Sequence, residues 1–487
     1  MTLQELLNGI SIRASKGDTC KEITGLCFDS RKVRPGHVFV AVRGYETDGH
    51  LYIGKAVASG ASCVVCEHIP TETGDNVTYV EVPDSSEALG LMSSAYFGNP
   101  TMHLKVIGVT GTNGKTSTAT LLYHLFRRMG KKCGLLSTVC NFIEGQKHDS
   151  SHTTPDPVEM NSLFAQMVQA GCEYAFMEVS SHSVVQKRIA GIDFDGGIFT
   201  NITRDHLDYH KTMDAYIRAK KAFFDALPAK AFALTNIDDR NGRLMLQNTK
   251  AHRYGYSLQS VCDFKTRVLE ESLEGMLLEI NGREVYTRFT GRFNAYNLTA
   301  VYGAASLLGM PENDILAAMS ILRPVAGRFE TVQCKGFTAI VDYAHTPDAL
   351  ENVLGTINDI KKSLPGSPKV ITVVGCGGNR DKGKRPMMGK IATRMSDLTV
   401  FTSDNPRMED PQTIIDEIVA GVDANCPGKY LCITDRRQAI RTACTIAQKG
   451  DIVLVAGKGH ETYQIIGKEK HHFNDVEEIA ACGASSE

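Results

Sequence analysis

The sequence lacks the features that mark proteins of membranes and of nucleic acids. It has 53 basic and 55 acidic residues and a net charge of −2, so the positive surplus that nucleic acid or an anionic membrane usually requires is missing. No uninterrupted apolar stretch reaches the ~18 residues that span a bilayer. The start, MTLQELLNGISIRASKGD, has no basic segment followed by an apolar core. We therefore expect a cytoplasmic monomer that binds small molecules, with neither nucleic acid nor a membrane as partner.

Disulfide and zinc patterns are also missing. The 14 cysteines occur in a long chain without an export signal, which is typical of reduced, mostly buried thiols. Cys63 and Cys66 form the only CxxC pair, inside the apolar run ASCVVC and without a second Cys or His pair at zinc-finger spacing. We expect these cysteines to pack in a core, and no cysteine is assigned a function.

The length and the local breaks in the sequence indicate three domains. The 487 residues are 42% hydrophobic and 22% charged, enough for about three domains of roughly 150 residues each. The turn FGNPT at Phe97–Thr101 precedes an apolar run, and LRPVAG at Leu322–Gly327 follows an apolar helical region over Leu298–Leu322. The sequence therefore predicts domains at residues 1–100, 101–325 and 326–487.

Short apolar runs alternate with amphipathic helices in the central and C-terminal parts, which is typical of an α/β fold with mostly parallel sheets and flanking helices. In the last third, the runs Val370–Val374, Leu398–Thr402 and Ile452–Ala456 end in the polar clusters GCGGNRDKGKR, SDNPR and GKGHE. Ligands of open α/β sheets bind at the carboxyl ends of strands, so we expect these clusters to share one pocket. GCGGNR is not a dinucleotide fingerprint, because Arg380 occupies its third glycine position.

The motif GVTGTNGKTS at residues 108–117 predicts a phosphate cradle. It joins an expected strand, His103–Val109, to an expected helix, Ser117–Met129. Its backbone N–H groups and the helix N-terminus suit phosphate, Lys115 can reach the β and γ phosphates of ATP, and Thr116 can offer a hydroxyl to Mg²⁺. The spacing is GxxGK[ST], shorter than the standard P-loop. The predicted ATP contacts here are Gly111, Thr112, Asn113, Gly114, Lys115, Thr116 and Ser117.

Three further strand ends or helices carry candidate groups. Glu178 follows the apolar run Tyr174–Met177 and suits Mg²⁺, although a solvated glutamate explains the local pattern equally well. His206, in TNITRDHLDYH, has acidic neighbours and could complete a metal or phosphate site. Lys220 and the next lysine lie in a predicted helix, where a solvent-facing basic pair is the ordinary interpretation.

Together these pieces resemble the Mur ligase family, ATP-dependent enzymes that add amino acids to the peptide of the cell-wall precursor. The resemblance rests on six motifs in order: GTNGKTS, MEVSSH, NITRDHLDYH, GRFNAYN, AGRFE and VDYAHTPDAL. It implies an N-terminal domain that holds the UDP end of the substrate, a central P-loop-type domain that holds ATP, and a C-terminal Rossmann-like domain that holds the incoming amino acid. The matching ATP and catalytic positions are Lys115, Glu178, His206, Asn294, Asn297, Arg328 and Asp342.

The resemblance also implies a chemistry. ATP phosphorylates a substrate carboxylate, and an amine attacks the acyl phosphate to form an amide, with cations screening the anions from each other. Lys220 matches a lysine that adds CO₂ to become a carbamate, an anionic oxygen ligand that suits a second Mg²⁺; unmodified lysine is the alternative. The implied metal donors are Thr116, Glu178, His206 and Lys220 as carbamate.

Within the family, DNPR at Asp404–Arg407 resembles the signature of members that add meso-diaminopimelate to UDP-N-acetylmuramoyl-L-alanyl-D-glutamate. Diaminopimelate carries a carboxylate that lysine lacks, and an arginine fork can bind it through two charge-assisted hydrogen bonds. A plain Asn-Pro turn is the alternative interpretation. The implied diaminopimelate contacts are Arg380, Asp404, Asn405, Pro406, Arg407, Gly457 and Glu461.

The UDP-peptide contacts follow from the same resemblance, although isolated Ser, Thr and Gln residues often serve only in turns or at the surface. They are Ser30, Tyr45, Glu46 and Thr47 for the UDP end, and Thr153, Thr154, Ser180, Gln186 and Arg188 for the muramoyl peptide.

Four other functions fit parts of the sequence. A lysine-adding cell-wall ligase would not need Arg407, and a folylpolyglutamate synthetase would need neither DNPR nor the N-terminal segment FDSRKV. A P-loop regulatory ATPase conflicts with the shortened loop and with the lack of an assignable Walker-B run. A non-catalytic UDP-sugar-binding protein is more remote.

Overall fold

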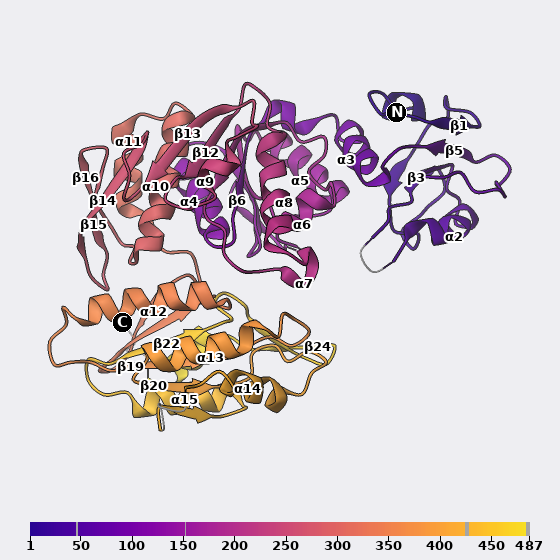
Figure 1. Cartoon of the computed structure of the whole chain (residues 1–487). Coiled ribbons are helices and arrows are strands. Elements are labelled where there is room, and N and C mark those ends of the chain that lie inside the picture. The colour runs from indigo at the N-terminus through magenta and orange to yellow at the C-terminus, as the bar shows by residue number, and fades with distance from the viewer. Residues whose placement is uncertain (45–46, 151, 424–427, 484–487) are drawn as a thin grey trace.

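The computed structural model describes residues 1–44, 47–150, 152–423 and 428–483. Three separate sheets follow one another along the chain, and a two-stranded hairpin lies near the C-terminus. Figure 1 shows the first sheet at the upper right, the central one at the upper left, and the C-terminal one below the central one. This order agrees with the predicted α/β architecture of three domains, whereas the domain limits at residues 100 and 325 stay a prediction.

The N-terminal sheet has the strand order β1-β5-β4-β3-β2, with only β1 antiparallel to its neighbour. Helices α1 and α3 pack on one face, and α2 packs on the other. The elements of this part are α1 (Leu3–Leu6), β1 (Ala14–Lys16), β2 (Gly25–Cys27), β3 (His37–Val40), the 3-10 helix η1 (Gly49–Tyr52), α2 (Ile53–Ala58), β4 (Cys63–Cys66), β5 (Thr78–Glu81), α3 (Ser85–Tyr96) and the 3-10 helix η2 (Pro100–His103).

The central part is the largest. Its elements are β6 (Lys105–Thr110), α4 (Lys115–Arg128), β7 (Cys133–Leu136), β8 (Asn141–Ile143), β9 (Gln146–His148), α5 (Pro157–Gln169), β10 (Tyr174–Glu178), α6 (Ser181–Val185), β11 (Phe194–Phe199), α7 (Leu207–His210), α8 (Met213–Asp225), β12 (Phe232–Asn236), α9 (Gly242–Met245), β13 (His252–Ser257), β14 (Phe264–Glu271), β15 (Met276–Ile280), β16 (Arg283–Thr287), α10 (Arg292–Leu307) and α11 (Glu312–Ile321).

The central sheet has the order β16-β15-β14-β13-β12-β11-β6-β10-β7-β8-β9. The strands from β14 to β7 are parallel, and the hairpins at both edges are antiparallel. Helices α4, α10 and α11 pack on one face, and α5 and α8 pack on the other. Covering both faces explains why β6, β7, β10 and β12 are buried along almost their whole length. Each fully buried large side chain there contributes about 1.5–3 kcal/mol.

The C-terminal sheet has the order β17-β18-β22-β19-β20-β21, with only β17 antiparallel. Helices α12 to α14 cover one face, and α15 and α16 cover the other. Its elements are β17 (Glu330–Gln333), β18 (Thr338–Asp342), α12 (Pro347–Lys361), β19 (Val370–Val374), α13 (Lys384–Met395), β20 (Leu398–Phe401), α14 (Pro411–Val419), β21 (Tyr430–Cys432), α15 (Arg436–Ile446), β22 (Ile452–Ala456), the hairpin β23 (Tyr463–Ile466) and β24 (Glu469–His472), and α16 (Asp475–Ala481).

Most predicted elements are confirmed within a residue or two at each end. The apolar region Leu298–Leu322 is an exception, because it forms two helices, α10 and α11, separated by a turn at Gly309. The cysteines of the described residues are unpaired thiols, and most are buried. No helix within those residues is both long and apolar enough to cross a membrane.

Candidate active site

Two cavities lie at the carboxyl ends of the central and C-terminal strands. The larger, about 480 Å³, is lined by both parts of the chain, and the smaller, about 410 Å³, lies on the other side of the cradle. Predicted residues that line the larger cavity are Thr112, Asn113, Gly114, Lys115, Thr116, Thr153, Thr154, Glu178, Ser180, Arg188, His206, Lys220, Arg328, Arg380, Asp404, Asn405, Arg407, Gly457 and Glu461. The three C-terminal polar clusters therefore share one pocket, as their strand ends predict.

The predicted phosphate cradle turns between β6 and α4. Gly114 begins α4 with a φ of +86°, and a methyl group on it would lie 2.5 Å from Asn297 Oδ1. A residue with a side chain adopts such a φ only at a cost of roughly 1–2 kcal/mol. Glycine is therefore required at this position both by the backbone and by the neighbouring side chain.

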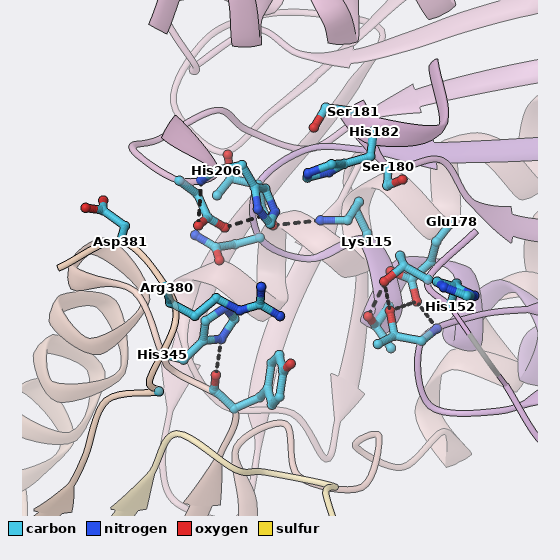
Figure 2. Close-up of a pocket in the computed structure, with 18 of the residues that line it drawn as sticks. Lys115, His152, Glu178, Ser180, Ser181, His182, His206, His345, Arg380 and Asp381 are labelled. Atoms are coloured by element: carbon cyan, nitrogen blue, oxygen red, sulfur yellow. Dashed lines mark hydrogen bonds and ion pairs between the residues drawn. The ribbon is translucent and has the colours of Figure 1, made fainter. Parts of the chain in front are cut away.

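Lys115 folds back over the cradle. Its Nζ donates to the carbonyl oxygens of Gly111 and Thr112, at 2.9 and 2.8 Å. Figure 2 shows this side chain between Glu178 and His206. Burial lowers the pKa of Lys115, and the carboxylate of Glu178 partly opposes that effect. Both of these hydrogen bonds go to neutral carbonyl oxygens, so an anion in the cavity would be a stronger hydrogen-bond partner for the ammonium.

Glu178 accepts hydrogen bonds from two sides at the end of β10. Thr116 Oγ1 donates to its Oε2 at 3.0 Å, and the backbone N and Oγ1 of Thr138 donate to its Oε1 at 2.7 and 3.0 Å. Arg328, from the C-terminal part of the chain, donates a hydrogen bond from its Nη2 to the Thr116 hydroxyl at 3.2 Å. Its guanidinium lies 4.5 Å from the ring centre of Tyr343. The Arg328 Nε is buried and has no hydrogen-bond partner among the described residues, which suits an anionic ligand.

Lys220 is buried on α8, so the alternative of a solvent-facing lysine is wrong for this residue. It is 1% exposed, its Nζ donates to Gly111 O at 2.7 Å, and it lies 4.6 Å from the ring centre of Tyr216. Burial and the nearby charge of Lys115 lower the pKa of Lys220 well below its usual value. A larger fraction of this amine is therefore neutral, which is the nucleophilic form.

His206 begins α7 and lies in a group of aromatic rings. Its Nε2 is 3.4 Å from Asp205 Oδ2, and its ring centre is 4.9 Å from that of His182. Burial lowers the pKa of His206, although Asp205 opposes the shift. The imidazole is therefore neutral near pH 7.

The donors that the sequence predicts for metal ions, Thr116, Glu178, His206 and Lys220, all line the larger cavity. Within the described ranges, no group of three or more His, Cys, Asp or Glu side chains is placed to hold a metal ion. Thr116 and Glu178 do form a pair of oxygen donors beside the cradle. Such a pair fits Mg²⁺, which takes one or two protein oxygens and fills its other positions with phosphate and water.

The predicted amino-acid site is built from the ends of β19, β20 and β22. Asn405 Nδ2 donates to Glu461 Oε2 at 2.8 Å, and Arg407 Nη1 donates to Gly378 O at 2.9 Å. Burial lowers the pKa of Arg407, and the like charge of Arg380 lowers it further. Two guanidiniums thus line one cavity beside a carboxylate. Pro406 does not line either cavity.

Lys458 is a member of this site that sequence reasoning missed. It is fully buried, and its Nζ contacts Asp404 Oδ1, Asn405 Oδ1 and Glu461 Oε2 at 3.3, 3.0 and 3.2 Å. Its position in GKGHE, two residues from a strand end, was the available signal. Thr138 and His182 also line the cavity, and His182 contacts the ring of His206. No sequence motif pointed to Thr138.

The predicted peptide contacts surround the start of α6. Thr154 Oγ1 donates to Glu178 O at 2.8 Å, and Arg188 donates to Thr154 O and to Gln186 Oε1, both at 2.9 Å. Gln186 itself lies outside the cavity lining and acts on Arg188. Ser180 caps α6 through Ser183 N.

The smaller cavity contains the remaining nucleotide candidates. Ser117, Asn297 and Asp342 line it, whereas Asn294 lies behind Asn297 with 3.4 Å between their side chains. Asp342 accepts from the backbone N of Phe329 and Ala344, both at 2.7 Å. Burial raises the pKa of Asp342 to about 6.

Two of the predicted UDP contacts, Ser30 and Thr47, lie within the described residues. Ser30 is buried after β2, and Thr47 is exposed. Neither lines the two cavities. Tyr45 and Glu46 lie outside the described residues.

Three family profiles match successive parts of the chain: "Mur ligase family, catalytic domain" at residues 22–97, "Mur ligase middle domain" at 109–305 and "Mur ligase, glutamate ligase domain" at 327–459. The chain belongs to the Mur ligase family.

Particular relatives are similar over nearly the whole chain. A "UDP-N-acetylmuramoyl-L-alanyl-D-glutamate--2,6-diaminopimelate ligase" of Phocaeicola vulgatus is 57% identical over 478 residues, which cover 98% of each chain. A solved structure with the same enzyme name is 32% identical, has a TM-score of 0.70, and covers 99% of this chain and 98% of that one. A MurF ligase of Thermotoga maritima in complex with ADP is 19% identical, with a TM-score of 0.61 and coverage of 94% and 96%, and shares the fold.

Proposed function

We propose that the protein is an ATP-dependent ligase that joins meso-diaminopimelate to the D-glutamate of UDP-N-acetylmuramoyl-L-alanyl-D-glutamate through an acyl phosphate. One observation carries the proposal: a single cavity contains the phosphate cradle and, across from it, the paired guanidiniums of Arg380 and Arg407. The name and the full-length similarity of the relatives support the same reaction.

The cradle binds the phosphates of ATP through backbone N–H groups and the N-terminus of α4. Lys115 leaves its two carbonyl partners for the β and γ phosphates, which are stronger acceptors because they are charged. The nucleoside end occupies the smaller cavity beside Asn297 and Asp342. Thr116 and Glu178 would hold Mg²⁺, which would supply screening of the phosphate charge.

The acceptor carboxylate must approach ATP, and both are anions. Lys115 and Arg328 lie on either side of Thr116 and lower that repulsion. Transfer of the γ-phosphoryl group breaks its bond to ADP and converts the carboxylate into an acyl phosphate. The amine then attacks the acyl carbon, and phosphate leaves as the amide forms.

The incoming amino acid binds at the C-terminal loops. Arg407, with Arg380 beside it, binds the distal carboxylate that lysine lacks, and Glu461 pairs with the distal ammonium. Lys458 screens Glu461 from Asp404, so that one pocket can hold both carboxylates.

The muramoyl peptide binds beside Thr153, Thr154, Ser180 and Arg188, where Gln186 orients Arg188. The UDP end binds the N-terminal part of the chain near Ser30. The proposal includes a monomeric enzyme that works in the cytoplasm, where ATP is available.

Lys220 is carbamylated in the active enzyme. Its burial, its lowered pKa and its place in the cavity support addition of CO₂ to a neutral amine. The carbamate would bring a negative charge into the cavity that Lys115 and the neutral His206 also line, where it could bind a second Mg²⁺.

The direct test is to identify the product. The purified chain is incubated with the UDP-dipeptide, ATP, Mg²⁺ and meso-diaminopimelate, and the mixture is analysed by mass spectrometry. The proposal expects a UDP-tripeptide that contains diaminopimelate, together with one ADP and one phosphate for each product. Hydrolysis of ATP without a new amide would contradict it.

A further inference from the structure

The two loops that carry Arg380 and Arg407 contact each other backbone to backbone. They are the first loop, residues 375–380, and the second loop, residues 404–409. Gly378 N donates to Asn405 O at 2.9 Å, and a methyl group on Gly378 would lie 1.9 Å from Pro406 O. The two loops therefore have no room to shift toward each other. This backbone hydrogen bond and the hydrogen bond from Arg407 Nη1 to Gly378 O tie them together beside the cavity, and further contacts join them outside it.

Glu409, at the end of the second loop, provides such contacts. Its Oε1 accepts a short hydrogen bond from the backbone N of Asn379, in the first loop. The side chain of Asn379 makes a second contact between the loops: its Oδ1 accepts a hydrogen bond from Met408 N at 3.1 Å. These two hydrogen bonds join the loops close to both arginines, since Asn379 directly precedes Arg380 and Met408 directly follows Arg407.

Arg385, on α13, holds the carboxylate of Glu409 in place. Its Nη1 donates to Glu409 Oε2 at 2.9 Å, and its Nη2 donates to Glu409 Oε1 and to Gly377 O, both at 3.1 Å. This guanidinium is fully buried and makes a second ion pair with Glu417 at 2.6 Å. Arg385 lowers the pKa of Glu409 to about 2, so the carboxylate stays charged throughout the neutral range.

The two cavity guanidiniums repel each other, since the charge of Arg380 lowers the pKa of Arg407. Arg407 also has a backbone φ of +52°, which a residue with a side chain adopts only when its surroundings impose it. Repulsion favours separation of the two guanidiniums, and the backbone of Arg407 keeps its φ only where its surroundings hold it. Additional contacts that fix the loops against each other would therefore help both guanidiniums to face one ligand.

We propose that Glu409 is a positioning residue that holds Arg407 and Arg380 at the spacing required to bind the distal end of the amino acid. The residue touches no ligand itself, because it lies outside the cavity lining and acts through Asn379 and Arg385. The inference rests on the proposed function and deepens it: selectivity for an amino acid with a second carboxylate depends on this link as well as on DNPR.

The test compares Glu409→Ala and Glu409→Gln with Glu417→Ala in the full chain. Glu417 is the matched control, because it pairs with the same Arg385 but contacts neither loop. Phosphate release is measured while diaminopimelate, lysine, ATP and the UDP-dipeptide are varied in turn, and each melting temperature is recorded. We expect Glu409→Ala to raise the KM for diaminopimelate about tenfold or more, because a charged hydrogen-bond acceptor is lost. The KM values for ATP and the UDP-dipeptide should change by less than about twofold.

The preference for diaminopimelate over lysine should fall by the same factor in Glu409→Ala and by a smaller one in Glu409→Gln, which keeps one acceptor. Glu417→Ala should keep the wild-type preference. An unchanged preference in Glu409→Ala, or a parallel rise of all three KM values with a lower melting temperature, would overturn the inference. The wild-type rate with diaminopimelate tests the proposed function separately, and if the wild type prefers another amino acid, the ratio of variant to wild-type KM for that compound still measures the role of Glu409.

Discussion

The side-chain amide of Asn113 donates to Asp348 Oδ2 at 2.8 Å, across 235 positions of sequence. Asn113 lies in the phosphate cradle, and Asp348 lies in the first turn of α12, so this bond joins the central part directly to the C-terminal part. The backbone of Asn113 is fixed as well, since its carbonyl oxygen accepts from Thr200 Oγ1 at 2.6 Å. The shape of the cradle thus depends on the position of the C-terminal part.

Asp348→Ala should therefore weaken catalysis more than folding. Loss of one hydrogen bond to a charged group predicts a fall in kcat/KM for ATP of about tenfold, with the KM for diaminopimelate changed little. Asp359→Ala is the control, because Asp359 lies on the same helix and its side chain is 64% exposed. Equal kinetics in the two variants would show that the bond does not shape the nucleotide site.

Gly114→Ala should lose ATP binding. Its φ of +86° costs roughly 1–2 kcal/mol for alanine, and the added methyl group would displace Asn297. Gly130→Ala is matched, because Gly130 has a φ of +75° at the other end of α4 and has open space around it. Calorimetry of ATP binding should show a large loss for the first variant only, although both should melt earlier. Normal ATP affinity in Gly114→Ala would refute the role given to the cradle.

The raised pKa of Asp342 predicts that nucleotide binding weakens at acid pH. Burial raises its pKa to about 6, so the carboxylate is charged above that pH and takes up a proton below it. Protonation removes its attraction for Arg328 and weakens its acceptance from Phe329 N. The KM for ATP should rise as the pH falls from 7 to 5.5.

The terminal phosphate of ATP also titrates near pH 6, so the variant Asp342→Asn is the control. Its KM for ATP should be higher than that of the wild type at pH 7, and its pH dependence should be flatter. Parallel profiles for the two proteins would assign the whole effect to ATP.

The activity of the enzyme should require CO₂, because Lys220 must be carbamylated. In a buffer stripped of CO₂, activity should fall and return when bicarbonate is added, and Lys220→Ala should be inactive under both conditions. Lys221→Ala is the neighbour control, since Lys221 pairs with Asp225 at 2.5 Å. Full activity of Lys220→Ala, or indifference of the wild type to bicarbonate, would exclude the carbamate.

Much of the fold follows from local patterns. The run Val370–Val374 was predicted at its observed limits, because both faces of its sheet are covered and four of its five residues are apolar. The turn from β6 to α4 was placed correctly, since the pattern of apolar residues and glycines that predicts it acts over a few residues; its role as a phosphate cradle stays a prediction. The break between α10 and α11 was missed, because apolar residues continue across the turn at Gly309.

The parts of the site that escaped prediction are contacts between distant segments. Lys458 reaches Asp404 only because β22 and β20 end at the same edge of one sheet. The burial of Lys220 depends on how α8 packs against the cradle, and its sequence neighbours gave no sign of it. Likewise the bond from Asn113 to Asp348 requires the docking of two sheets, which no local pattern encodes.

The central claim is that Arg407 selects the amine that attacks the acyl phosphate. The most direct measurement is phosphate release from ATP with the UDP-dipeptide and with meso-diaminopimelate, lysine or no amino acid, for the wild type and for Arg407→Ala. The account predicts release only with an amino acid, a strong wild-type preference for diaminopimelate, and a variant that loses mainly affinity for diaminopimelate. Release without any amino acid, or a wild-type preference for lysine, would contradict it.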